Sequence, residues 1–300
     1  MNRLFGAYVM VDFSAAEGKK TGEASVWIGV MKRDVRFRLS YEAHNPATRA
    51  AAMTQLRGIL ADLHKRGDRV LIGVNFALGF PRGLNAKLGL GDWTGMWDFL
   101  GKTVVDKPDN TNNRFQVAAK INRLTTDEAW PFWGGPKSAA QKWLSTLKPE
   151  TFGGFPEYRL TEDAARHRVK KTHAPKSLWQ MHGAGVVGGQ AMLGIVAIKA
   201  LVDSMAGKAR VWPFQTGFGA LEAEGFGEID TVVAEVFPPL FEGLAEAGEV
   251  KDAAAVRLTA TALAEMDDRG ELGALFAAPK GLSEADLAVA ASEEGWMLGV

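Results

Sequence analysis

The chain has 300 residues, of which 47% are hydrophobic and 23% are charged, a composition typical of a globular protein with a buried core. Its 35 basic and 35 acidic residues cancel, so it lacks the overall positive charge of a typical nucleic-acid-binding protein. The absence of cysteine excludes disulfides, thiolate metal ligands and cysteine nucleophiles. Residues 1–13 lack a signal-peptide pattern, and no apolar run approaches the ~20 residues that span a bilayer. We therefore expect a cytoplasmic protein without a membrane partner.

The first 80 residues predict strands and one helix in a definite order. Apolar or alternating runs predict strands at 7–11, 25–31, 35–40 and 70–76, and helical spacing predicts a helix at 46–66. Asn45 and Pro46 supply the cap and first-turn proline of that helix, and Gly67 ends it. This order predicts three antiparallel strands, a crossover helix and a fourth strand parallel to the first.

The middle of the chain, residues 81–172, has a looser pattern. It contains many of the tryptophans, several glycine and proline breakers, the polar run DNTNNRF, and helical stretches at 115–124 and 137–147. Long irregular segments in a compact chain usually carry function. We interpret this segment as an insertion or lid within one domain that spans residues 1–300.

Regular patterns return after Lys176. A glycine-rich turn at 183–189 precedes predicted helices at 191–205, 251–266 and 283–293 and predicted strands at 210–214 and 231–238. Together with the first part of the chain, these elements predict an α/β fold with a mixed sheet flanked by helices.

Three acidic residues lie at the ends of predicted elements. Asp12 follows the first strand, Glu235 lies near the end of the last strand, and Asp286 lies in the first turn of the last helix. The carboxyl ends of parallel strands meet at one edge of a sheet, where ligands bind. Carboxylates clustered there favour Mg²⁺ or Mn²⁺, which can activate water and stabilise a transferred phosphoryl group. The alternative is that each residue caps an element or forms a salt bridge; for the set, we favour the functional interpretation.

The run GAGVVG contains Gly183, Gly185 and Gly188 in the G-x-G-x-x-G spacing of a dinucleotide site. The segment KSLWQMH before it is a poor strand, so we interpret the run as a helix start whose glycines allow close packing. The free N–H groups of such a helix could bind an anion, with Lys176 and Ser177 nearby. His173 and His182 are further candidates to line the site.

Four segments carry a resemblance to a known family. YVMVDFSAA, LIGVNFALGFPRG, AEVFPPL and ADLAVAASEEGWMLGV are similar to segments of the predicted RNase H-like nucleases, a family of domains of unknown function. The resemblance covers residues 1–80 and 171–300 and leaves the middle unexplained. It implies a ribonuclease H-like fold, in which carboxylates converge on a divalent metal.

Carried over position by position, the resemblance implies metal ligands at Asp12, Asn75, Glu235 and Asp286, with Asp252 as a second candidate for the last. Asn75 stands where the family has an aspartate. A neutral amide still offers an oxygen ligand, but the site loses one negative charge and therefore binds its cation more weakly.

Two main functions are consistent with these residues. The first is a metal-dependent phosphodiester hydrolase that uses Mg²⁺ or Mn²⁺, with Asp12, Glu235 and Asp286 as catalytic residues. The second is a non-catalytic protein of the same fold that binds a nucleotide, a small phosphate-bearing ligand or nucleic acid. The candidate ligand-binding residues are Ser14, Asn113, Arg114, Lys176, Gly183 and Gly185. A third interpretation, an interaction module, requires the tryptophan-rich segment to expose a large apolar patch.

Overall fold

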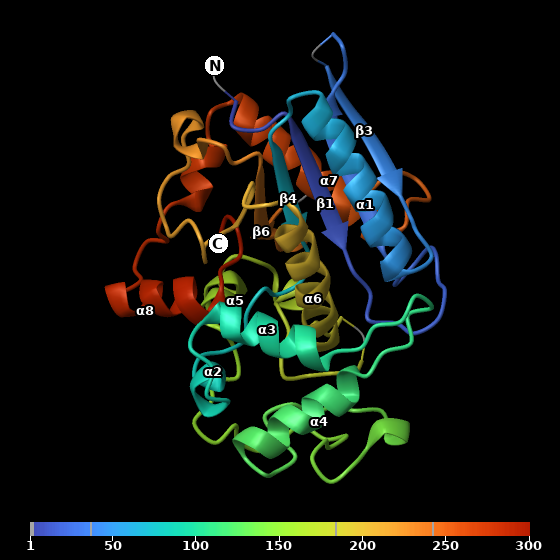
Figure 1. Cartoon of the computed structure of the whole chain (residues 1–300), viewed down its shortest axis with the longest axis vertical. Helices are drawn as coiled ribbons and strands as arrows, with labels where there is room; N and C mark the ends of the chain where they lie inside the picture. Colours follow the sequence, from blue (N-terminus) through green and yellow to red (C-terminus); the bar gives the residue numbers. More distant parts are fainter. Residues whose placement is uncertain (1–2, 37, 184, 242) are drawn as a thin grey trace.

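A computed structural model describes residues 3–36, 38–183, 185–241 and 243–300 (Figure 1). These residues form a six-stranded sheet with strand order β3-β2-β1-β4-β6-β5. The strands are β1 (Ala7–Asp12), β2 (Trp27–Arg33), β3 (Leu39–His44), β4 (Val70–Val74), β5 (Ala209–Val211) and β6 (Thr231–Glu235). β2 is antiparallel to β1 and β3, whereas β1, β4, β6 and β5 are parallel. The expected α/β class with a mixed sheet is therefore confirmed.

The helices flank the sheet and also surround the end of it at which β1 and β4 terminate (Figure 1). They are α1 (Arg49–Lys65), α2 (Leu84–Lys87), α3 (Trp93–Thr103), α4 (Arg114–Thr125), α5 (Leu160–Arg166), α6 (Gly188–Ser204), α7 (Lys251–Asp268) and α8 (Glu284–Val289). A π-helical segment, Ala290–Glu294, follows α8. In the described part of the chain, no helix combines the length and the apolar character needed to cross a membrane.

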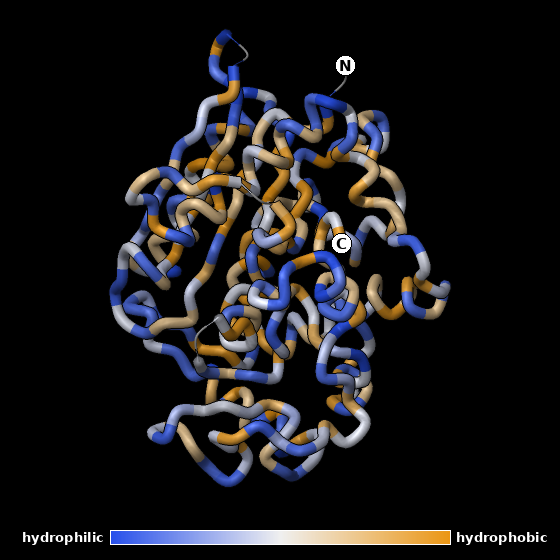
Figure 2. Tube along the Cα trace, turned by 180° about the vertical axis from the view of Figure 1, so that it is seen from behind, coloured by the Kyte–Doolittle hydropathy of each residue, from blue (hydrophilic) through white to orange (hydrophobic). Residues whose placement is uncertain are grey.

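Different helices cover the two faces of the sheet. Along β1, Val9 and Val11 pack in one core with α1 and α6, whereas Tyr8 and Met10 pack in a second core with α7. This division follows from the strand geometry, because successive side chains point to opposite faces. Figure 2 shows that hydrophobic residues concentrate along the central elements, while hydrophilic residues follow much of the periphery.

Residues 81–172 extend the core on the α1 and α6 face. Trp97 of α3 is 2% exposed, and Trp93 stacks on Phe214 with ring centroids 5.0 Å apart. The remaining tryptophans of this segment, Trp130, Trp133 and Trp143, are half-buried and pack against the same core. This burial disfavours the interpretation of the segment as an exposed tryptophan-rich partner surface.

The third strand begins later than the sequence predicts. β3 starts at Leu39, and Val35 is 97% exposed in the preceding turn; Phe37 lies outside the described residues. The side chain of Asp34 accepts hydrogen bonds from the backbone N–H groups of Arg36 (2.8 Å) and Arg38 (3.0 Å). These bonds stabilise a longer turn, so the alternating pattern at 35–40 does not continue as a strand.

Two helix predictions also need correction. α1 begins after Thr48, whose Oγ1 accepts from the N–H of Ala51 (3.1 Å), while Asn45 instead accepts from Gly22 N–H (2.7 Å). The predicted helix at 137–147 is wrong: only the short 3₁₀ turn Lys137–Ala139 forms there. Asn122 of α4 donates to the carbonyl oxygen of Trp143 (2.7 Å), so tertiary hydrogen bonding competes with the helical pattern.

Candidate ligand-binding site

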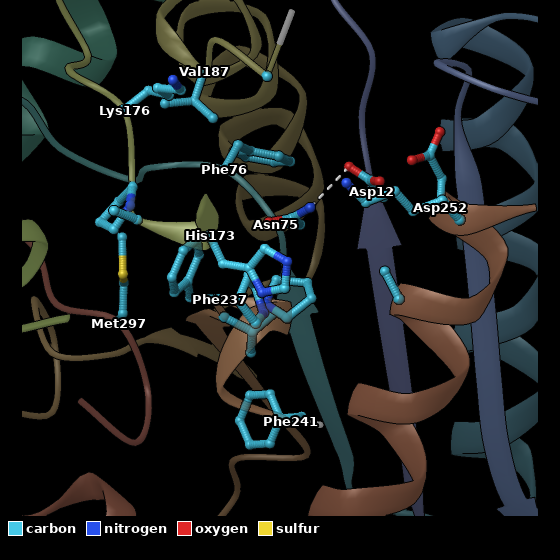
Figure 3. Close-up of a pocket in the computed structure, with 18 of the residues that line it drawn as sticks. Asp12, Asn75, Phe76, His173, Lys176, Val187, Phe237, Phe241, Asp252 and Met297 are labelled. Carbon is cyan, nitrogen blue, oxygen red and sulfur yellow. Dashed lines mark hydrogen bonds between the residues drawn. The ribbon is translucent and has the colours of Figure 1, made fainter. Parts of the chain in front are cut away.

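Three parallel strands end level with one another at one edge of the sheet. Val11 of β1 pairs with Val74 of β4, which in turn pairs with Glu235 of β6. A pocket of about 910 Å³ lies at this edge (Figure 3). Its walls come from the ends of these strands, from the segment 170–178, and from the first turns of α6 and α7. Open α/β sheets generally bind their ligands at this position.

Asp12 and Asn75 form the polar floor of the pocket. The backbone N–H of Asn75 donates to Val11 O (2.9 Å), so Asn75 continues the pairing of β4 with β1. Its side-chain Nδ2 donates to Asp12 Oδ1 at 3.2 Å (Figure 3). Strand alternation places both side chains on the α7 face, which is also the face of Met10. The structure therefore brings these two predicted site residues together.

Asp252 approaches the same pair from the first turn of α7 (Figure 3). Its Oδ2 accepts a hydrogen bond from the N–H of Ala24 (2.7 Å). Asp12 is only 8% exposed. Burial and, secondly, the negative charge of Asp252 raise the pKa of Asp12 to about 8, although the hydrogen bond from Asn75 lowers it. At neutral pH, Asp12 therefore carries a proton in most molecules.

Glu235 forms an ion pair instead of standing free for a metal. It shares the face of Val233, which packs in the α1 and α6 core, so it points away from the face of Asp12. Arg159 donates from Nη2 to Glu235 Oε1 (2.6 Å) and from Nη1 to Glu235 Oε2 (2.9 Å). Arg159 is 0% exposed and Glu235 is 2% exposed. Both carboxylate oxygens of Glu235 are therefore bound to a buried guanidinium.

The same arginine holds a second carboxylate, Glu162. Arg159 Nε donates to Glu162 Oε1 (3.0 Å), and its backbone N–H donates to Glu162 Oε2 (2.9 Å), which satisfies a free N–H group at the start of α5. Burial lowers the pKa of Arg159, but the charges of Glu162 and Glu235 raise this pKa by more, so the guanidinium stays charged. The pKa of Glu162 is raised, because the effect of burial exceeds the lowering by Arg159. These three side chains, the Arg159 cluster, form a buried ionic wall of the pocket.

The segment after α8 completes this wall. Arg159 Nη1 donates to Glu294 O (2.7 Å), and the N–H of Leu298 donates to Glu235 O (2.8 Å). Met297 lines the pocket beside them. Residues near position 300 therefore hold together parts of the pocket that are far apart in the sequence.

The remaining walls combine basic and apolar side chains. Lys170, His173 and Lys176 line one side, and Lys251 lines the pocket from the start of α7. Phe237 is half-buried and contributes an aromatic surface. The other apolar lining residues include Phe76, Val187, Phe241, Leu244, Leu258 and Met297. The pocket thus combines apolar side chains with a set of polar and charged groups. Small-molecule sites generally use both kinds of lining.

Several other predicted site residues lie outside this pocket. Asp286 is half-buried in the first turn of α8, where its Oδ2 accepts from Ser283 Oγ (2.7 Å), and α8 lies at the periphery (Figure 1). Ser14 Oγ accepts from the N–H of Ala16 (3.1 Å) and so stabilises a turn. Of the two candidates for the last acidic ligand, Asp252 lines the pocket and Asp286 does not.

The polar loop before α4 is also engaged elsewhere. The side chain of Asn113 accepts from Val105 N–H (2.7 Å), and Arg114 Nη1 forms an ion pair with Glu17 (3.0 Å). Neither Asn113 nor Arg114 lines the pocket, and the candidate His182 does not line it either. Their contacts hold the start of α4 and the loop after β1 in place.

Of the glycines in the run GAGVVG, Gly185 lines the pocket and Gly183 does not. A Cβ added to Gly188 would lie 2.3 Å from Leu178 O, so this position requires glycine for close packing. Within the described residues, no named strand lies between α5 and α6, as a dinucleotide fingerprint would need. The run therefore begins α6 as expected, with Lys176 of the preceding segment at the pocket.

The residues of the pocket do not fit the divalent-metal centre that the resemblance implies. Glu235 is bound to Arg159, and Asp286 lies on α8. Within the residues described, no group of three or more His, Asp or Glu side chains is placed to hold a metal ion. Of the expected ligands, only Asp12, Asn75 and Asp252 share the pocket without being bound to Arg159.

Neither the Arg159 cluster nor Lys251 was predicted from the sequence as part of the site. Arg159 and Glu162 are three residues apart, the spacing of a capping box, but this pattern does not reveal a pairing with Glu235, 76 residues away. Lys251 could have been found from its position directly before Asp252, which was already a candidate site residue.

Comparison with known proteins adds no relative: the family-model scan, the search of curated proteins and the search of solved structures each found no match to this chain.

Proposed function

We propose that this chain binds a small organic anion, a phosphate ester with an apolar or planar body, in the pocket at the carboxyl edge of the sheet. One observation carries the proposal: the pocket of about 910 Å³ is lined by lysines and apolar side chains, and the negative charge of its buried carboxylate, Glu235, is neutralised by Arg159. Convergent polar groups in an otherwise apolar pocket are characteristic of small-molecule sites.

Lys176 and Lys251 supply positive charge for the anion. Both are exposed at the pocket, and within the described residues neither has an ion-pair partner. Lys251 begins α7, where the helix dipole disfavours a cation by roughly 0.3–1 kcal/mol, so helix stability does not explain its position. An ammonium group suits a phosphate as a point charge and hydrogen-bond donor.

Metal-dependent phosphodiester hydrolysis on a ribonuclease H-like fold stays a second proposal. Three antiparallel strands, a crossover helix and a parallel strand support that fold. The shared position of Asp12, Asn75 and Asp252 supports a weak cation site. The ion pair between Glu235 and Arg159 counts against a full set of acidic ligands.

The test measures thermal unfolding with pyrophosphate and with nucleoside monophosphates, first in EDTA and then with Mn²⁺. A ligand at a hundredfold excess over its Kd adds about 2.7 kcal/mol to the free energy of unfolding, which raises Tm by several degrees. Lys176→Gln and Lys251→Gln should each weaken this shift. Lys280→Gln, which removes an exposed lysine outside the pocket, is the matched control.

The proposal is supported if a phosphate ligand raises Tm in the presence of EDTA and this increase is smaller in both pocket variants but unchanged in the control. No rise with any of these phosphates would overturn the proposal. A rise with Mn²⁺ alone that is lost in Asp12→Asn would instead favour the metal-dependent function.

A further inference from the structure

One face of α7 lines the pocket with a cation at its start and apolar residues beyond it. The lining residues on this face are Lys251, Ala254, Ala255 and Leu258. Their spacing places them in a single stripe, because residues three, four and seven positions apart lie on the same side of an α-helix. With a rise of 1.5 Å per residue, the stripe is roughly 10 Å long. It therefore presents an ammonium group at one end and only apolar side chains beyond it.

The neighbouring acid, Asp252, does not belong to this stripe. It lies about 100° further around the helix, and its Oδ2 accepts from the N–H of Ala24 (2.7 Å). Lys251 is exposed, and it forms no ion pair with any of the residues that the structure describes. The positive charge at the head of the stripe is therefore available to an anion.

The segment after β6 forms a second apolar wall of the pocket. It contributes five lining residues: Phe237, Pro238, Pro239, Phe241 and Leu244. In Figure 3, Phe241 lies at the end of the pocket opposite Lys176. A Cβ added to Gly243 would lie 2.5 Å from Leu258 Cδ2, so this wall meets the α7 stripe at the Leu258 end. We call the part of the pocket between the stripe and this wall the α7 groove.

The α7 groove offers little to a polar ligand. Apart from Lys251, the side chains named on its two walls are apolar, and its two prolines have no backbone N–H group. The polar edges of a nucleobase would lose water there without gaining partners, which is unfavourable. An aliphatic chain needs no such partners, and each buried methylene group adds to its affinity.

We propose that the pocket binds a phosphate monoester of an aliphatic alcohol, with the phosphate at Lys251 and an alkyl chain in the α7 groove. This inference rests on the proposed function, since it names the ligand class of the same pocket. The roughly 10 Å between the ends of the stripe accommodate a chain of about eight carbons. The cation at the head and the closed apolar end together match an anion with an apolar tail.

The experiment measures the affinity of methyl, butyl, octyl and decyl phosphate by isothermal titration calorimetry in EDTA, below the concentrations at which the longer probes form micelles. A fully buried methylene group increases affinity about fourfold. We expect octyl phosphate to bind at least about tenfold more tightly than butyl phosphate. Decyl phosphate should add little more, because the two walls meet at Leu258. Uridine monophosphate, the planar probe, should bind more weakly than octyl phosphate.

Two substitutions separate the head of the groove from its closed end. Leu258→Asn should lower the affinity for octyl phosphate about tenfold and leave that for butyl phosphate unchanged, because the shorter chain does not reach this end. Lys251→Gln should lower the affinity for every alkyl phosphate by a similar factor. Leu282→Asn changes a half-buried leucine outside the pocket and serves as the matched control.

The outcomes distinguish this inference from the function on which it rests. Equal affinity for methyl, butyl and octyl phosphate, or tighter binding of uridine monophosphate, would overturn the aliphatic ligand while leaving anion binding intact. Equal affinity for octanol and octyl phosphate would overturn the role of the phosphate. If none of the phosphates, including pyrophosphate, bound to the wild type, both the inference and the proposed function would fail.

Discussion

Replacing Asp12 by asparagine should stabilise the protein, and the gain should grow with pH. The folded state keeps the Asp12 proton up to about pH 8, whereas the ordinary pKa of the side chain is 3.8. Between these values, the unfolded chain binds fewer protons than the folded chain, so wild-type stability falls as pH rises. Asparagine does not titrate, and its amide oxygen can still accept from Asn75 Nδ2.

The magnitude follows from the pKa difference. One pKa unit corresponds to about 1.4 kcal/mol, so the variant should gain up to about 4 kcal/mol over wild type at pH 7. The gain should level off above about pH 8, where Asp12 is ionised in both states, and vanish below about pH 4. Relaxation around the buried carboxyl would reduce these values, but not their sign.

Urea denaturation from about pH 5 to pH 9 measures this difference. Asp62→Asn, which changes an exposed carboxylate on α1, serves as the control. Its free energy of unfolding should depend on pH in the same way as that of wild type. A constant difference between Asp12→Asn and wild type across this range would refute the reasoning, since it would show that burial does not perturb the Asp12 titration.

Two further substitutions test the framework of the pocket. Arg159→Leu leaves two buried carboxylates without their counterion, so urea denaturation should show a loss of about 3–5 kcal/mol at pH 7 that shrinks on acidification. A loss that does not depend on pH would mean that Arg159 acts only through packing. Gly79→Ala would place a Cβ 2.2 Å from Glu293 O and should lower the free energy of unfolding by about 1–3 kcal/mol. Gly91→Ala, with no neighbouring atom within 4 Å, is its matched control; equal effects would contradict the predicted clash.

The strand ends were the part of the site that the sequence predicted best. An unbroken apolar run that stops at a polar residue marks a buried strand, and this signal located both Asp12 and Asn75. The same signal at Glu235 did not reveal its orientation. Strand alternation assigns Glu235 to the opposite face, but only once the packing of Val233 is known.

Other parts of the site depend on contacts between distant segments. Asp252 and Asp286 both lie in first helical turns, and the sequence favoured Asp286 for the site. Only the packing of α7 against β1 brings Asp252 to the pocket. Arg159 similarly gains its role from Glu235, 76 residues away, in a segment without regular strand or helix periodicity.

The closure of the pocket wall by residues 294–298 has a consequence for biosynthesis. A nascent chain that has emerged only as far as α7 already contains all six strands, but Arg159 and Glu235 still lack their partners at Glu294 and Leu298. The sheet can therefore assemble before this wall of the pocket does. The complete pocket wall should form late during translation, so that a ribosome-bound fragment ending at α7 carries a formed sheet beside an incomplete pocket.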